Sequence, residues 1–150
     1  MYRQRRELMQ YTALFGLMAS VGLISTAQAE EWNKAAFEGK SLDEVYKALG
    51  SGVPEKSSLV TLTAPDIAEN GAVVPVSIST SLKAQQIAIL VDKNPNTLAA
   101  QFSIPAGTDS FVTTRIKMAQ TSNVYALVKA EGKWSMAVKE IKVTLGGCGG

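Results

Sequence analysis

The sequence predicts an all-β protein, an antiparallel β-sandwich with a short helical segment at its N-terminal end. Beyond residue 56 the spacing of apolar residues changes from a period near 3.6 to a period of two. Seven short segments with the character of strands follow, although the alternation is imperfect in some of them, and clusters of Gly, Pro, Asn and Asp separate them. Such frequent short strands are typical of sandwiches. The 150 residues suffice for one domain whose core needs no disulfide.

Residues 1–29 have the pattern of a cleaved export signal. Three arginines lie within the first six residues, an apolar stretch follows at 11–24, and residues 27–29 form the small-x-small site that signal peptidase cuts. The apolar stretch is shorter than the roughly 20 residues that cross a bilayer. We therefore expect export to the periplasm and no membrane anchor after cleavage. An amphipathic N-terminal anchor is the alternative.

The export route is indicated by Arg5 and Arg6, which Leu8 follows two places later, as in a twin-arginine signal. The match is incomplete, because Gln4 stands where Ser or Thr is usual and Gln10 where Lys is usual. A Sec signal is the alternative. The twin-arginine route carries folded cargo, and assembly with a partner before export is a reason for a small protein to use it.

A helical turn or two is expected at residues 32–37, and a second helix after it. Ser41 and Glu44 form a capping box, in which each side chain satisfies a free backbone donor of the first turn. Leu42, Val45 and Leu49 share one face. The helix is expected to end at Gly50 and Gly52, and Pro54 prevents its return.

Strands are expected at residues 59–63, 73–80, 85–92, 98–104, 110–118, 123–130 and 133–145. The apolar run 87–91 indicates a central strand covered on both faces; the alternative is a strand whose outer face meets another protein. Four large residues within these strands are assigned to the core and to no site, namely Phe102, Tyr125, Trp134 and Met136.

Composition excludes several functions. The chain has no histidine, so it has no Ser-His-Asp triad and no His-ligated metal. Its single cysteine excludes a thiolate zinc cluster, and no cofactor site is predicted. The net charge of +2 comes from the signal: its removal leaves 12 basic and 12 acidic residues. Nucleic-acid binding is therefore not expected.

The one reactive residue, Cys148, stands at the end of the chain between Gly146, Gly147, Gly149 and Gly150. A core cysteine sits in an apolar pattern, whereas glycines at a chain end predict a mobile segment. We interpret residues 146–150 as a thin arm that enters a narrow channel of another protein, with 30–145 as the folded domain. No Lys or Arg in this pentapeptide activates the thiol, so partner enzymes are expected to do so. An intermolecular disulfide or a chemical attachment point is the alternative.

The chain resembles the SoxY family, the sulfur-carrier subunits of the periplasmic Sox thiosulfate-oxidising system. The terminal Gly-Gly-Cys-Gly-Gly matches the family's carrier motif in full, and residues 68–76 and 93–95 are also similar. The resemblance covers the whole chain, and its specific part is the pentapeptide together with the export signal.

The resemblance implies an immunoglobulin-like β-sandwich that forms a heterodimer with a SoxZ-like subunit. A SoxXA-like haem cytochrome would join thiosulfate oxidatively to Cys148. A SoxB-like hydrolase would then release sulfate, and a SoxCD-like sulfur dehydrogenase, where present, would oxidise the remaining sulfur. The chain itself would be a covalent carrier and not an enzyme, because the oxidation requires a redox centre that no residue here supplies.

Two other classes of function compete with the carrier. A periplasmic β-sandwich binding module would use the tail only as a tether. A thiol enzyme would require a base beside Cys148, which the sequence does not provide.

Overall fold

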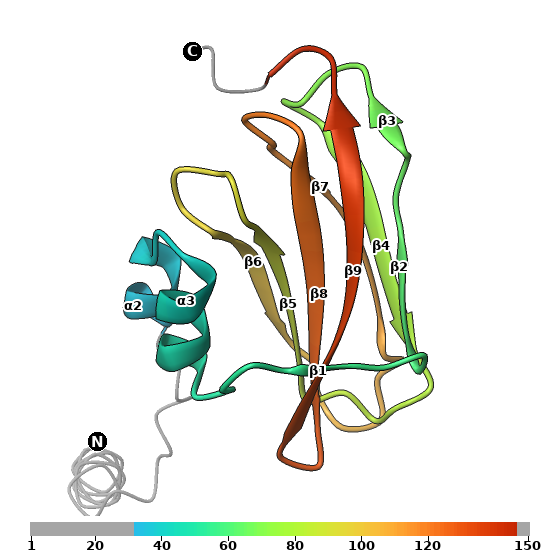
Figure 1. Ribbon diagram of the computed structural model, residues 1–150. Coiled ribbons are helices and arrows are strands. Elements are labelled where there is room, and N and C mark those ends of the chain that lie inside the picture. The colour runs from blue at the N-terminus through green and yellow to red at the C-terminus, as the bar shows by residue number, and fades with distance from the viewer. Residues whose placement is uncertain (1–31, 147–150) are drawn as a thin grey trace, which may run out of the picture. The chain divides into compact units, whose positions relative to one another are not determined.

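A computed structural model describes residues 32–146, which form two short helices and two packed β-sheets (Figure 1). The elements are α2 (Lys34–Glu38), α3 (Leu42–Leu49), β1 (Glu55–Lys56), β2 (Val60–Thr63), β3 (Ile67–Ala68), β4 (Val74–Thr80), β5 (Gln86–Val91), β6 (Leu98–Ser103), β7 (Phe111–Ile116), β8 (Ser122–Ala130) and β9 (Lys133–Val143). The predicted export signal, 1–29, lies outside the described residues. None of the helices within 32–146 is long and apolar enough to cross a membrane.

The larger sheet has the strand order β1-β9-β8-β5-β6, with β3 also paired to β9, and the smaller has the order β2-β4-β7. The predicted all-β, immunoglobulin-like sandwich with a short N-terminal helical segment is confirmed. All seven predicted strands are present, with ends that differ by at most two residues. The sequence did not predict β1 and β3, which pair with β9 in parallel, so the sheet is not purely antiparallel.

The helices begin and end at capping residues. Asn33 Oδ1 accepts a hydrogen bond from Ala36 N at 3.1 Å, so α2 begins two residues later than predicted. Ser41 Oγ accepts from Glu44 N at 3.3 Å, as the capping box requires. The reciprocal bond differs from the prediction, because the Glu44 carboxylate accepts from Lys40 N at 2.7 Å. Gly50 ends α3 in the left-handed conformation.

The hairpin between β8 and β9 has a two-residue loop, Glu131 and Gly132, which joins the register pair Ala130 and Lys133. Both loop residues have positive φ, 51° and 74°, as a type I′ turn requires. This turn sets the register of the two longest strands. Because β9 runs away from the hairpin, its C-terminal residue lies at the opposite end of the sheet (Figure 1).

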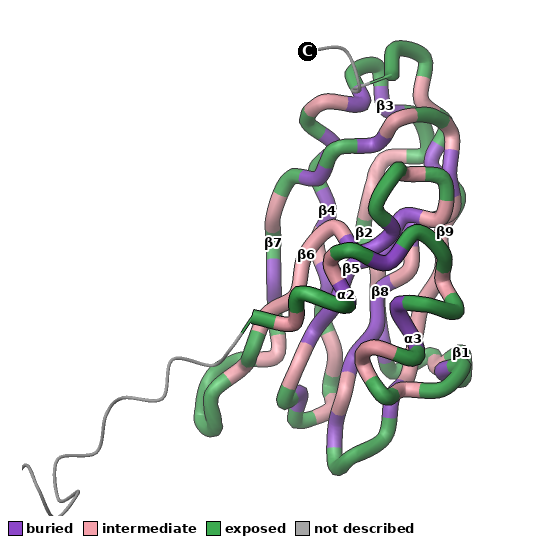
Figure 2. The backbone as a smooth tube through the Cα atoms, turned by 90° about the vertical axis from the view of Figure 1, so that its left-hand side faces the viewer, coloured by how far each residue is buried: buried purple, intermediate pink, exposed green. Residues whose placement is uncertain are grey.

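Two apolar cores lie on the two faces of the larger sheet, and β5 contributes to both. Ile87, Ile89 and Val91 pack between the sheets, whereas Ala88 and Leu90 pack under the helices. The predicted central strand, covered on both faces, is therefore confirmed (Figure 2). The sequence assigns four large residues to the core, and Trp134 is buried there as expected. The other three are partly buried at the margins of the two cores, namely Phe102, Tyr125 and Met136.

Candidate functional site

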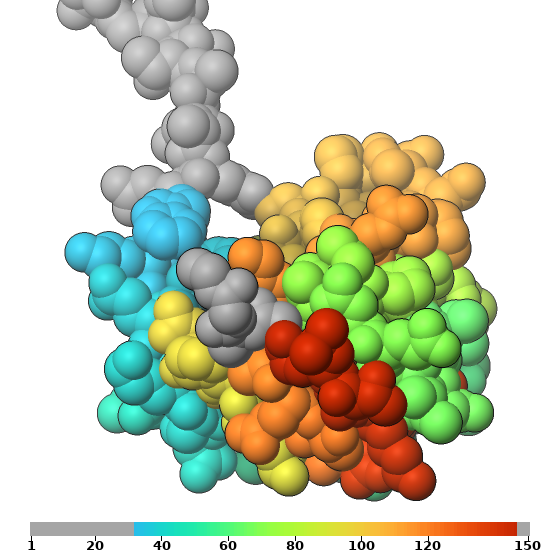
Figure 3. All heavy atoms as spheres, turned by 90° about the horizontal axis from the view of Figure 1, so that it is seen from above, coloured from blue at the N-terminus to red at the C-terminus, as the bar shows by residue number. Residues whose placement is uncertain are grey.

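The chain reaches the predicted arm through Thr144 and Leu145, and both are hydrogen-bonded to the end of β3 or to the segment that follows it. Thr144 N donates to Ala68 O at 3.1 Å, and its hydroxyl donates to Glu69 O at 3.2 Å. Leu145 O accepts from Gly71 N at 2.7 Å. Seen from this end of the molecule, the last described residues lie against the loop between β3 and β4 (Figure 3). Hydrogen bonds thus fix the point at which the chain enters the predicted arm.

A second segment, 117–119, lies beside this attachment. Met118 N donates to Gly71 O at 2.7 Å, and the Met118 side chain is fully buried in the core between the sheets. The side chain of Asn94, in the loop between β5 and β6, holds this segment from the other side. Its amide donates to Lys117 O at 2.7 Å, and its oxygen accepts from Ala119 N at 2.9 Å.

Gly146 is the only predicted site residue among those the structure describes. A Cβ built on it would overlap the carbonyl oxygen of Ala119, so glycine allows a close approach of two backbones here. Cys148, Gly147, Gly149 and Gly150 lie outside the described residues, and their assignment stays a prediction. Sequence reasoning missed the contribution of Gly71 and Asn94 to this site. Both stand in the two internal stretches that resemble the family, 68–76 and 93–95, and that resemblance was the available signal.

Clusters of metal-ligating side chains and groups with shifted pKa values are the usual marks of a catalytic site. The described residues contain no group of three His, Cys, Asp or Glu side chains that could hold a metal ion. The pKa values of Tyr46 and Tyr125 are raised, chiefly because burial disfavours the phenolate. Both tyrosines belong to the core under the helices and not to the attachment of the arm.

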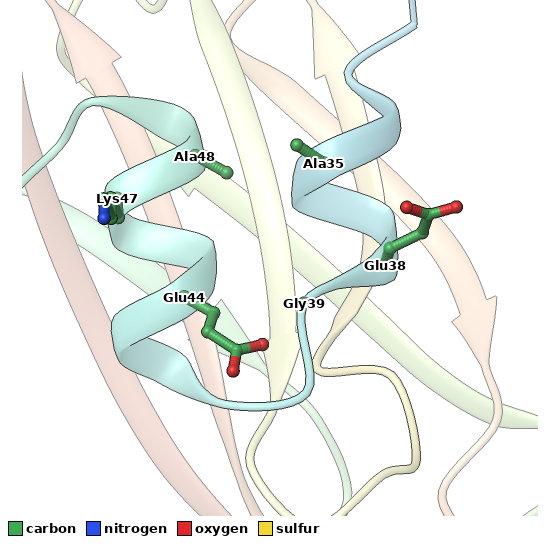
Figure 4. A pocket seen from close by; sticks show the side chains of 6 residues that line it. All are labelled: Ala35, Glu38, Gly39, Glu44, Lys47 and Ala48. Atoms are coloured by element: carbon green, nitrogen blue, oxygen red, sulfur yellow. The ribbon is translucent and has the colours of Figure 1, made fainter.

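A hollow of about 560 Å³ lies between α2 and α3. It is lined by Ala35, Glu38, Gly39, Glu44, Lys47 and Ala48. Figure 4 shows the methyl groups of Ala35 and Ala48 facing one another across it, while the Glu38 carboxylate points away from α3. Glu44 already caps the helix. With methyl groups in the middle and charges at the rim, the hollow presents no arrangement for catalysis.

Comparison with known proteins identifies the family. The family model described as "Sulfur oxidation protein SoxY" matches residues 45–148, which include both internal stretches and the cysteine. The sulfur carrier protein SoxY from Chlorobium limicola f thiosulfatophilum is 38% identical, with a TM-score of 0.60 over 69% of this chain and 94% of that chain.

A second solved structure, Bacteroides uniformis beta-glucuronidase 2, is 14% identical over 59% of this chain and 11% of that chain. The TM-score of this match is 0.41. A search of curated proteins found no match. The family model covers more than half of the chain, and the Chlorobium protein is similar over nearly its whole length. The chain belongs to the SoxY family of sulfur oxidation proteins.

Proposed function

We propose that this protein is a periplasmic sulfur carrier that holds thiosulfate-derived sulfur covalently on Cys148 and presents it to separate enzymes. One observation carries the proposal: the family match extends through residue 148 and so includes the only cysteine of the chain. The similarity to a solved sulfur carrier of the same family supports it.

The chemistry assigned to Cys148 begins with an oxidation. The thiol and thiosulfate lose two electrons and one proton to form a sulfur–sulfur bond, which gives a cysteine S-thiosulfonate with a terminal sulfonate. A thiol and thiosulfate do not join without an oxidant, so the electrons must pass to a partner, for which a SoxXA-like haem cytochrome is the candidate. Water then attacks the sulfonate sulfur, the second sulfur–sulfur bond breaks, and sulfate leaves while a persulfide remains on Cys148.

The attachment of the arm suits a carrier. Cys148 stands two residues beyond Gly146, so its backbone reaches at most about 7 Å from the last described residue. A short arm of this kind can place its thiol in a recessed site only if the partner docks against the domain close to the point where the arm begins. In this proposal the chain positions the thiol of Cys148, and the partner enzymes supply the base, the metal or the redox centre.

Partners and location follow the same proposal. The protein works as a heterodimer with a SoxZ-like subunit and meets SoxXA-like, SoxB-like and, where present, SoxCD-like proteins. Export by the twin-arginine-like signal 1–29 places it in the periplasm, and assembly with its partner before export explains the choice of that route.

The experiment is an intact-mass measurement on the mature protein purified from the periplasm of thiosulfate-grown cells, with and without reductant. We expect reductant-sensitive additions equal to S2O3 or to one or more sulfur atoms, all lost in Cys148→Ser, and an N-terminus at Glu30. Cys148→Ser should unfold at the wild-type temperature, because its residue lies in the arm. Recovery of Cys148 only as free thiol or simple disulfide would overturn the carrier role.

A further inference from the structure

We propose that Asn94 and Gly146 are positioning residues that fix where the arm leaves the domain, and that transfer to partner enzymes depends on this fixed origin. The proposal rests on the carrier function proposed above and concerns how the domain delivers its cysteine. We call the group formed by Gly71, Asn94, residues 117–119, Leu145 and Gly146 the arm clamp.

Asn94 is bonded at both ends of its side chain to one short segment. Its amide nitrogen donates to Lys117 O and its oxygen accepts from Ala119 N, at 2.7 and 2.9 Å. The segment follows β7, 23 residues further along the chain. A carboxamide is the neutral side chain of this size that offers both a donor and an acceptor. Asn94→Asp would keep the acceptor for Ala119 and lose the donor for Lys117.

Two more hydrogen bonds connect residues 117–119, through Gly71, to the start of the arm. Met118 N donates to Gly71 O and Gly71 N donates to Leu145 O, both at 2.7 Å. The buried side chain of Met118 anchors the segment in the core between the sheets. The order of contacts is therefore from Asn94 to 117–119, then to Gly71, and then to Leu145, one residue before the predicted arm.

Gly146 completes the clamp by its lack of a side chain. A Cβ at this position would overlap the carbonyl oxygen of Ala119. Ala119 cannot retreat freely, because its amide is held by Asn94. An alanine at 146 would therefore move either the clamp or the first residue of the arm. Gly146 therefore allows the backbones of the arm and of Ala119 to approach closely, whereas a glycine in a flexible linker adds conformational freedom.

A fixed origin matters because the arm is short. A tethered group has a high effective concentration at a target only when the tether spans the distance from its origin to that target. A loosened origin spreads the positions of Cys148 and lowers the fraction that reaches a recessed site. We therefore expect clamp variants to react normally with small reagents and poorly with partner enzymes.

The test uses full-length mature carrier in its heterodimer, as wild type, Asn94→Ala and Gly146→Ala, with the exposed Asn96→Ala as the matched control. Tetrathionate loads the thiol, because the thiolate displaces thiosulfate from it and forms the cysteine S-thiosulfonate. Sulfate release by a SoxB-like hydrolase then gives kcat/KM. We expect it to fall about fivefold or more in Asn94→Ala, which loses two hydrogen bonds, and in Gly146→Ala, whose added methyl group would displace Ala119 or the start of the arm, and to stay unchanged in the control. Alkylation of Cys148 by iodoacetamide should proceed at the wild-type rate in all four proteins.

Amide hydrogen exchange gives a readout independent of sulfur chemistry. In Asn94→Ala the amides of Gly71 and Ala119 should exchange faster, while that of Val45, which donates to Ser41 O in α3, should not change. Unchanged exchange would refute the clamp, and faster exchange with a wild-type kcat/KM would refute its role in transfer. If wild-type carrier releases no sulfate, the proposed function is wrong, and the exchange result still tests the clamp by itself.

Discussion

Leu90→Ala tests whether α2 and α3 are an integral layer of the domain. Leu90 lies on the central strand, is fully buried, and packs under the helices with Val45, Tyr46 and Leu127. Removing a buried leucine side chain without collapse of the site lowers the free energy of unfolding by about 2–5 kcal/mol. A domain of roughly 115 residues unfolds with an entropy near 240 cal/mol/K, so each kcal/mol corresponds to about 4 °C. We expect Tm to fall by about 8–20 °C.

The assay is thermal unfolding followed by far-UV circular dichroism and by tryptophan fluorescence, with Leu59→Ala as the matched control. Leu59 is 50% exposed, and its truncation should change the free energy of unfolding by no more than about 0.5 kcal/mol. Coincident transitions would show that the helices unfold together with the sheets. A loss below about 1 kcal/mol for Leu90→Ala would refute the packing of the helices on β5.

Two further predictions concern buried polar groups. Thr97 is fully buried and its hydroxyl has no hydrogen-bond partner, so Thr97→Val should raise the free energy of unfolding by about 1 kcal/mol in a urea titration; a decrease would contradict the missing partner. The pKa of Tyr46 is raised from 10.0 by burial, then by Tyr125 and Asp43, so its contribution to stability is complete below pH 10 and is lost as pH rises through the folded pKa. Tyr46→Phe should therefore lose less stability than wild type between about pH 8 and pH 11, and an equal loss would exclude Tyr46 as a source of the alkaline instability.

Local signals predicted the strands well, because each of the seven carries an alternating pattern or a short apolar run and is bounded by turn residues. The Glu131–Gly132 turn shows why this works, since two adjacent residues with positive φ suffice to close the hairpin. The strands β1 and β3 were missed for the opposite reason. Two residues have no period, and these strands exist only because β9 offers its backbone to them.

The site was predictable only in its chemistry. The sequence assigns Cys148 and its glycines to the site because a lone thiol among glycines has no structural explanation, and this assignment stays a prediction. The contacts of Asn94 could not be predicted, because its partners Lys117 and Ala119 are distant in sequence and are backbone groups, whose identity no residue type reveals. The close approach at Gly146 likewise depends on tertiary packing, so the glycine pattern alone predicted freedom where the fold imposes contact.

The two short parallel strands, β1 and β3, also hinder self-association of the protein. An open strand edge is a template for pairing with another chain, and β9 is the longest strand of the molecule. Its outer edge is occupied at one end by β1 and at the other by β3, and Lys139 between them is paired with Asp66. Two copies thus cannot extend a common sheet through the outer edge of β9, the strand that leads to the predicted arm. The same two strands that close this edge against a second copy also close it against any other chain that would pair with β9.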